Sequence, residues 1–243
     1  MLDPHEALTI QQLFSTSFSQ VQKDHAISHV LSVLRNFTTD LVFYGGTGLA
    51  RTFLERGRLS EDIDIFTSNR IDLIRELDSL PELILQEFPE AYWSVKPSQI
   101  SEPGKALLVC QSGVQIEVQA ISVQMRGWKE IPVAPREIHQ RYSDVPKIVL
   151  KTPTLDGFSA MKLAAWFDRG TSRDLFDLEG LTHLGPVSSR TRNLMVELLG
   201  VNLTFAMLDR RVVGYWRDDL AHQTRLEITE EQALSRVLEW WGR

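Results

Sequence analysis

Residues 41–66 read LVFYGGTGLARTFLERGRLSEDIDIF, and this stretch decides the predicted fold. Residues 39–44 are rich in β-forming side chains, and the two glycines that follow end the run. Residues 47–55 carry apolar side chains at helical spacing, so we expect a helix after the glycines. Residues 61–66 then alternate acidic and apolar side chains, as a strand with one polar face does. The stretch therefore predicts a strand, a glycine turn, a helix and a second strand.

Two carboxylates stand two positions apart on the second of these strands. Side chains at positions i and i+2 of a strand share a face, so Asp62 and Asp64 can converge while Ile63 enters the core. Glu117 stands between apolar residues in VQIEVQ and leaves its own predicted strand on a single polar face. Like charges directed at one point need a cation, and Mg²⁺ prefers oxygen ligands. The pattern predicts that these three carboxylates hold Mg²⁺, with Mn²⁺ as the alternative ion.

The glycine turn has the properties of a triphosphate-binding loop. Gly45 and Gly46 let the backbone approach phosphates closely, and the helix that follows offers free amide groups. The Thr47 hydroxyl adds another hydrogen-bonding group. Two metal ions about 3.5–4 Å apart can activate an attacking hydroxyl and stabilise a leaving pyrophosphate. The predicted reaction moves a nucleoside monophosphate from a nucleoside triphosphate to an acceptor hydroxyl.

The remaining periodicity predicts an α+β half followed by a helical half. Helices are expected over 20–37 and 71–85, and strands over 106–111 and 114–121. From about residue 153 onward the pattern is helical. Two prolines and this change of period place the boundary at residue 150, so we expect domains over 1–150 and 151–243.

Cationic and acidic side chains stand close together at the start of the helical half. Lys162 and Arg169 are seven residues apart, so they share a helix face that can meet phosphates. Arg58 is a further phosphate candidate. Thr171 can cap the next helix, which places Asp174 in its first turn. The same two residues have the spacing of a capping box, so a purely structural role for Asp174 stays open.

Composition excludes several classes of protein. The 243 residues, 43% hydrophobic and 24% charged, fit an ordinary globular chain. A net charge of −6 argues against coating nucleic acid by bulk attraction, although one basic groove remains compatible with it. The single cysteine, Cys110, supports neither an internal disulfide nor a multi-cysteine zinc site. No apolar run is long enough to span a membrane, and the N-terminus lacks the pattern of a signal peptide, so we expect a cytoplasmic location.

Four motifs together resemble the AbiEii/AbiGii-type nucleotidyltransferases, many of which are toxins of bacterial toxin–antitoxin or phage-defence systems. They are GGTGLA (45–50), RLSEDIDIF (58–66), IEV (116–118) and KLAAWFDRGTSRDLFDL (162–178). The resemblance implies a polymerase-β-like nucleotidyltransferase fold, in which helices flank a mixed sheet and an all-helical domain follows. It also implies strand carboxylates that bind metal, a nucleoside triphosphate as donor, and roles in nucleotide binding or catalysis for Lys162 and Asp174.

Relatives in this superfamily attach nucleotides to the acceptor end of transfer RNA. The resemblance therefore implies tRNA or another RNA as acceptor, and a cognate antitoxin protein as partner. Two alternatives stay open from the residues. One is a catalytically weak nucleotide-binding protein that acts by contacting a partner. The other is a phosphotransferase that moves the γ-phosphoryl group to a protein hydroxyl and uses the same metal site.

Overall fold

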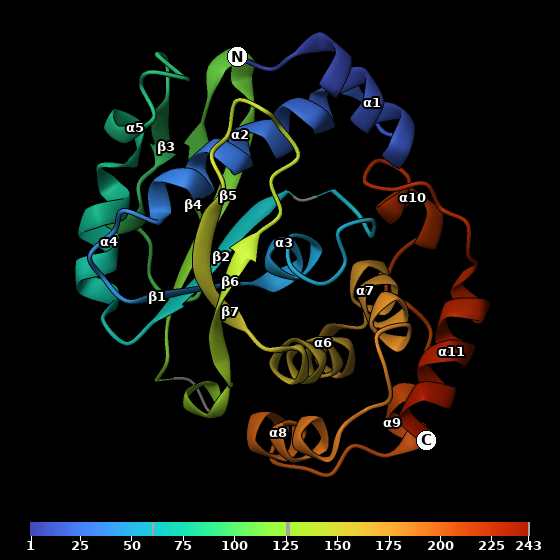
Figure 1. The fold of residues 1–243 in the computed structure, drawn as a ribbon. Helices are drawn as coiled ribbons and strands as arrows, with labels where there is room; N and C mark the ends of the chain where they lie inside the picture. The colour runs from blue at the N-terminus through green and yellow to red at the C-terminus, as the bar shows by residue number, and fades with distance from the viewer. Residues whose placement is uncertain (60, 125–126, 243) are drawn as a thin grey trace.

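The computed structural model describes residues 1–59, 61–124 and 127–242 (Figure 1). Ser60, inside one of the quoted motifs, lies outside these ranges. Within them, seven strands form one sheet in the order β3-β4-β5-β2-β1-β7-β6. The strands are β1 (Leu41–Tyr44), β2 (Asp62–Thr67), β3 (Tyr92–Val95), β4 (Ala106–Val109), β5 (Gln115–Ser122), β6 (Val133–Ile138) and β7 (Ile148–Pro153).

Helices make up most of the rest of the described chain. They are α1 (Pro4–Phe14), α2 (Phe18–Leu34), α3 (Gly45–Ala50), α4 (Arg70–Asp78), α5 (Leu80–Leu83), α6 (Leu155–Arg169), α7 (Ser172–Thr182), α8 (Ser189–Leu199), α9 (Phe205–Leu208), α10 (Trp216–Leu220) and α11 (Glu230–Gly242), with short 3₁₀ turns at Pro97–Gln99, Gln111–Gly113 and Trp128–Glu130. Among the described residues, no helix is both long and apolar enough to cross a bilayer.

The sheet is mixed, and the strand with the paired carboxylates lies at its centre. β2 runs parallel to β5 on one side and antiparallel to β1 on the other. β1 in turn runs parallel to β7. A parallel neighbour needs a long connection, and the segment between β2 and β5 supplies it with α4, α5, β3 and β4. The central position of β2 places its polar face where several elements can reach it.

Helices cover both faces of this sheet, as Figure 1 shows. On one face, α2, α4 and α5 pack on a core that includes Phe43, Ile63 and Ile65. On the other face, α6, α7, α8 and α11 pack on a core that includes Tyr44 and Phe66. Because strand side chains alternate, Ile63 and Ile65 face the first core, and Asp62 and Asp64 face the side where α6 and α7 lie. The predicted mixed sheet flanked by helices, with a helical C-terminal part, is confirmed.

The helix expected over residues 71–85 is divided into α4 and α5. An uninterrupted helix would leave the Leu77 carbonyl without its bond from Pro81, which has no N–H group. In the structure the Trp93 indole donates to that carbonyl at 3.1 Å. The helix ends at Asp78, and Pro81 lies in the first turn of α5, where proline is tolerated.

The sheet extends beyond the expected strands at both edges. β6 contains Pro135, and proline is tolerated there because β6 is an edge strand with one unpaired side. β7 lies between β6 and β1, and its range contains the predicted domain boundary at residue 150. The helical part begins at Leu155 and shares a core with the sheet. The division into two domains stays a prediction.

Candidate active site

The three predicted metal-binding carboxylates lie on one face of the sheet. In the parallel pairing of β2 with β5, Asp62 stands directly beside Glu117. The Lys105 ammonium lies 3.5 Å from Asp62 Oδ2 and 2.5 Å from Glu117 Oε2, so it joins the two carboxylates. Asp64 follows two positions after Asp62 on the same face. All three carboxylates therefore leave the same face of the sheet, and their binding of a shared cation stays a prediction.

Electrostatics separate the two aspartates. Burial and the charge of Asp62 raise the pKa of the Asp64 carboxyl from 3.8 to about 7. Burial also acts to raise the pKa of Asp62, but Lys105 and Arg58 outweigh it and lower that pKa below its ordinary value. Asp62 therefore ionises more readily than Asp64. Two oxygen donors that repel each other, with a third beside them, fit a hard divalent cation such as Mg²⁺.

The glycine turn packs directly against these carboxylates. Gly45 has a φ of +73°, and a Cβ atom there would lie 2.0 Å from Asp64 Oδ2. A Cβ atom at Gly46 would lie 2.1 Å from Arg58 Nη2. Neither position accepts a side chain without displacing its neighbour. Gly45 therefore brings the backbone against the acidic face, which is the face of the sheet that carries Asp62, Asp64 and Glu117. The helix expected over residues 47–55 begins earlier and ends sooner, since α3 spans Gly45–Ala50 and contains both glycines in its first turn.

Thr47 is buried and engaged with the protein. Its hydroxyl donates to the backbone carbonyl of Asp62, and its side chain lies 1% exposed. The hydroxyl therefore fastens the glycine turn to the strand that carries the carboxylates. Its predicted contact with a phosphate stays a prediction.

A buried layer of ion pairs lies beneath the turn. The Arg58 guanidinium donates from Nε and Nη2 to the two carboxylate oxygens of Asp177, at 2.9 and 3.0 Å. Lys162 Nζ lies 2.6 Å from Asp177 Oδ2, and both cations are only 6% exposed. Asp177 Oδ2 is also 3.5 Å from the position of a Cβ atom at Gly46. Lys162, on α6, thus faces the glycine turn from the helical side, with Asp177 between them.

Asp174 connects α6 with α7. Arg169 Nε and Nη2 donate to its carboxylate at 2.7 and 2.8 Å, and the Thr171 hydroxyl donates to it at 2.6 Å. Lys162 Nζ lies 3.5 Å away. Burial opposes ionisation of Asp174, but Arg169 and Lys162 hold its pKa well below the usual range. Because the Thr171 side chain bonds this carboxylate and not the helix backbone, the capping box left open by the sequence does not form.

Two residues of the site were missing from the predicted set. Asp177 follows Asp174 by three positions, and this helical spacing was the available signal. Lys105 precedes β4, and only the pairing of β4 with β5 brings it to Glu117. No local pattern marks it, since it stands in an ordinary Gly-Lys dipeptide.

Comparison with solved structures identifies proteins of similar fold. The structure is similar to MenT4, a nucleotidyltransferase toxin from Mycobacterium tuberculosis, with a TM-score of 0.67 and 20% identity over 97% of this chain and 88% of that one. An antigenic nucleotidyltransferase-like protein from Paracoccidioides brasiliensis gives a TM-score of 0.42 and 16% identity, over 74% and 88% of the two chains. The similarity to MenT4 shows that the two proteins share a fold. No curated protein sequence matches the chain significantly.

The family comparison covers most of the chain. The model of the nucleotidyl transferase AbiEii toxin family, described as belonging to type IV toxin–antitoxin systems, matches residues 30–234. The match contains every element that contributes to the acidic face, the glycine turn and the ion-pair layer. This chain therefore belongs to the AbiEii family of nucleotidyltransferase toxins.

Proposed function

We propose that this protein is a metal-dependent nucleotidyltransferase that moves a nucleoside monophosphate from a nucleoside triphosphate to an acceptor hydroxyl. The observation that carries the proposal is the joint placement of Asp62, Asp64 and Glu117 on one sheet face, with Asp64 packed against the turn at Gly45. An acidic face beside a side-chain-free turn binds a cation and the phosphates that the cation neutralises.

Each polar group then has a separate task. Mg²⁺, or Mn²⁺ in its place, would when bound supply Lewis-acid activation of the α-phosphorus and charge neutralisation for the leaving pyrophosphate. Asp62 and Asp64 would hold the metal, and Glu117 would complete its ligand set. The Glu117 side chain is 52% exposed and accepts the proton of the acceptor hydroxyl. As this proton leaves, the acceptor oxygen bonds to the α-phosphorus and the bond from that phosphorus to pyrophosphate breaks. Lys162 stabilises the negative charge that develops on the phosphates.

The two arginines in the predicted set receive different tasks. Arg58 is buried, with its guanidinium held by Asp177 and by Gln223 Oε1 at 2.7 Å, so we assign it to positioning of the glycine turn. Arg169 carries a side chain that is 58% exposed, beside the buried Asp174. It is the better placed of the two to meet a triphosphate or an acceptor. Asp174 sets the orientation of Arg169 and, more weakly, of Lys162.

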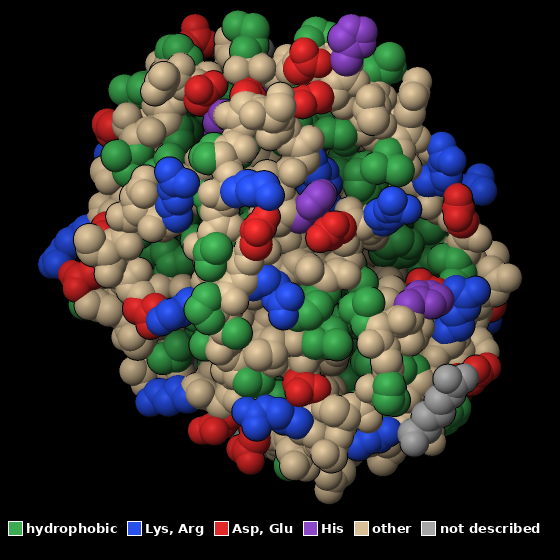
Figure 2. Space-filling model, viewed as in Figure 1, with side chains coloured by type: hydrophobic (Ala, Val, Ile, Leu, Met, Phe, Trp, Pro, Cys, Tyr) green, Lys and Arg blue, Asp and Glu red, His purple; other side chains and the backbone are tan. Residues whose placement is uncertain are grey.

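We propose RNA, with tRNA as the first candidate, as the acceptor. Figure 2 shows positive and negative side chains interspersed over the face drawn, which agrees with the net charge of −6 and with local recognition of nucleic acid. Three partly exposed cations near the carboxylates support such recognition. They are Lys105 (40% exposed), Arg169 (58% exposed) and Arg173 (44% exposed). As a member of a toxin family, the protein is proposed to act in the cytoplasm and to have a cognate antitoxin protein as partner.

A labelling experiment tests the reaction. The purified protein is incubated with Mg²⁺, total RNA and cell protein, and each nucleoside triphosphate labelled at the α or the γ position in turn. Label transferred to RNA from the α position only supports the proposal. Label from the γ position on protein would show the phosphotransferase alternative, and no transfer in any mixture would favour the catalytically weak binding protein.

Variants assign the activity to the site. Asp62→Asn and Asp64→Asn should each lower transfer by about 10²- to 10³-fold with the fold retained, since the loss of one group that stabilises transition-state charge has an effect of that order. Asp218→Asn, the same change on an exposed helix, is the matched control. Full activity in both site variants would contradict the metal assignment.

A further inference from the structure

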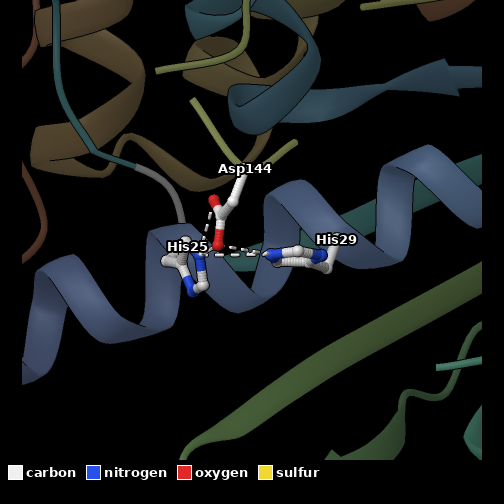
Figure 3. A group of neighbouring side chains, drawn as sticks. All are labelled: His25, His29 and Asp144. Carbon is white, nitrogen blue, oxygen red and sulfur yellow. Dashed lines mark hydrogen bonds and ion pairs between the residues drawn. The ribbon is translucent and has the colours of Figure 1, made fainter. Parts of the chain in front are cut away.

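A second group of metal-ligating side chains lies away from the acidic face. His25 and His29 stand four residues apart on α2, so they share a face of that helix. Asp144 reaches them from the segment between β6 and β7. Figure 3 shows the two imidazole rings and the carboxylate directed toward one another. Among the described residues, this is the one group in which three such ligand atoms lie within 4.8 Å of one another.

The spacing of the three ligand atoms fits one tetrahedral ion. His25 Nε2 is 3.1 Å from His29 Nε2 and 3.0 Å from Asp144 Oδ2, and His29 Nε2 is 3.6 Å from the same oxygen. Ligands at about 2.0–2.2 Å from a tetrahedral zinc ion stand about 3.3 Å apart. The three observed separations lie on both sides of that value, so a single ion can reach all three atoms.

Hydrogen bonding alone does not satisfy this arrangement. A neutral imidazole carries at most one proton on Nε2, and His25 Nε2 is within 3.1 Å of both Asp144 oxygens and of His29 Nε2. That single proton would have to serve the carboxylate and the second ring at once. If both Nε2 atoms carried protons, two N–H groups would face each other. An ion lets both rings donate a lone pair and keep their protons on Nδ1.

The surroundings are those of a built site. The two histidines are 5% and 4% exposed, and the Asp144 side chain is 23% exposed. The Tyr142 ring packs edge-on against His25 at 4.8 Å between centroids, and the Phe88 ring packs edge-on against His29 at 5.4 Å. These contacts fix the ring orientations. The Asp144 carboxylate is also paired with the exposed Met1 ammonium, which lies 2.8 Å from Oδ2 and would have to give way to the ion.

We propose that His25, His29 and Asp144 bind one divalent transition-metal ion, with zinc as the ion that this donor set favours. Two imidazoles and one carboxylate favour transition-metal ions such as zinc, whereas the all-oxygen donors of the acidic face favour Mg²⁺. α2 packs on the sheet face opposite Asp62 and Asp64, so the two sites are separate. The proposal does not depend on the reaction proposed above.

Such an ion would brace the segment that supports the glycine turn. Tyr142, two residues before Asp144, donates its hydroxyl to Asp24 Oδ2 at 2.9 Å. Asp24 accepts from Arg51 Nη2 at 2.8 Å, and both of these side chains are fully buried. Arg51 directly follows α3. Fixing Asp144 to α2 therefore restrains the contacts behind α3, and the expected effect of the ion is on stability.

The test measures zinc binding in a protein whose catalytic carboxylates are removed. The Asp62→Asn/Asp64→Asn variant is purified with a native N-terminus and no histidine tag, because the Met1 amine lies 2.8 Å from Asp144 Oδ2. Zn²⁺ is titrated against a chromophoric chelator, and Co²⁺ is used to detect visible absorption bands of a low-symmetry site. We expect one equivalent of zinc per chain and a higher melting temperature with the ion.

Three further changes in that background locate the site. His29→Gln and Asp144→Asn should each weaken zinc binding by more than about 100-fold, because even changes outside the ligand set cost 10–100-fold. His5→Gln, which removes an exposed histidine from α1, should bind zinc as the background does. Circular dichroism verifies folding, and Asp144→Asn, in a loop, serves if His29→Gln fails to fold. Binding below one equivalent in the background, or equal affinity in all three variants, would overturn the proposal.

Discussion

Replacing Asp64 with asparagine should stabilise the metal-free protein at neutral pH. Burial and the charge of Asp62 raise the pKa of Asp64 from 3.8 to about 7, so ionising Asp64 costs more in the folded chain than in the unfolded chain. Between about pH 4 and pH 7 the folded protein binds more protons than the unfolded chain does. The free energy of unfolding therefore falls as pH rises through this window.

The size of the effect follows from the pKa difference. A change from 3.8 to about 7 corresponds to about 4 kcal/mol above pH 7. Asp64 is only partly buried, so water screening should reduce the measured gain of Asp64→Asn to about 1–2 kcal/mol. For a chain of this length, that gain raises the melting temperature by about 2–8 °C.

Calorimetry in a metal chelator at pH 4, 6 and 8 measures this gain. The variant and the wild type should differ least at pH 4 and most at pH 8, and Asp218→Asn should show no such trend. Added Mg²⁺ should raise the melting temperature of the wild type more than that of Asp64→Asn. A variant that melts at or below the wild-type temperature at pH 8 would refute the argument that the two carboxylates repel each other.

Three other predictions concern the turn and the cations. Lys162→Ala should lower the free energy of unfolding by about 3–5 kcal/mol, because it removes one of the cations paired with the buried Asp177 carboxylate. It should also lower the transfer rate more than triphosphate affinity, and an unchanged rate would show that Lys162 has only a structural role. Gly45→Ala should abolish transfer by displacing Asp64. Gly113→Ala is the control, because Gly113 has a similar φ of +75° but no atom lies within 4 Å of the new Cβ; it should cost only about 1–2 kcal/mol of stability and leave transfer intact. Lys105→Ala should raise the apparent affinity for Mg²⁺ in activity titrations by about two- to fivefold, since it removes a cation that competes for Asp62 and Glu117. A lower affinity for Mg²⁺ would show that Lys105 supports the site.

Several elements of the site could be predicted because their signals are local. The alternation at Asp62–Ile65 determines which side chains of β2 face the core, since strand geometry has a period of two. Gly170 ends α6 in the left-handed conformation at φ +61°, as its residue type indicates, and Thr171 is the residue just before α7. Four residues of separation place His25 and His29 on one helix face.

Other parts of the site depend on contacts between distant segments. Glu117 lies beside Asp62 because β5 pairs in parallel with β2, and a shift of one residue in that pairing would turn Glu117 to the opposite face. Asp177 meets Arg58 across 119 residues of sequence, and Asp144 meets His25 across the same separation.

The sequence by itself determined the family, the order of the elements around the glycine turn and the polar face of β2. Only the tertiary structure decided that Glu117 lies beside Asp62, that Lys105 lies between these two carboxylates, and that Asp177 holds two buried cations. The physical reason is that side-chain periodicity depends on the backbone of one segment. Strand register and ion pairing depend on how separate segments pack, and no short stretch of sequence records that packing.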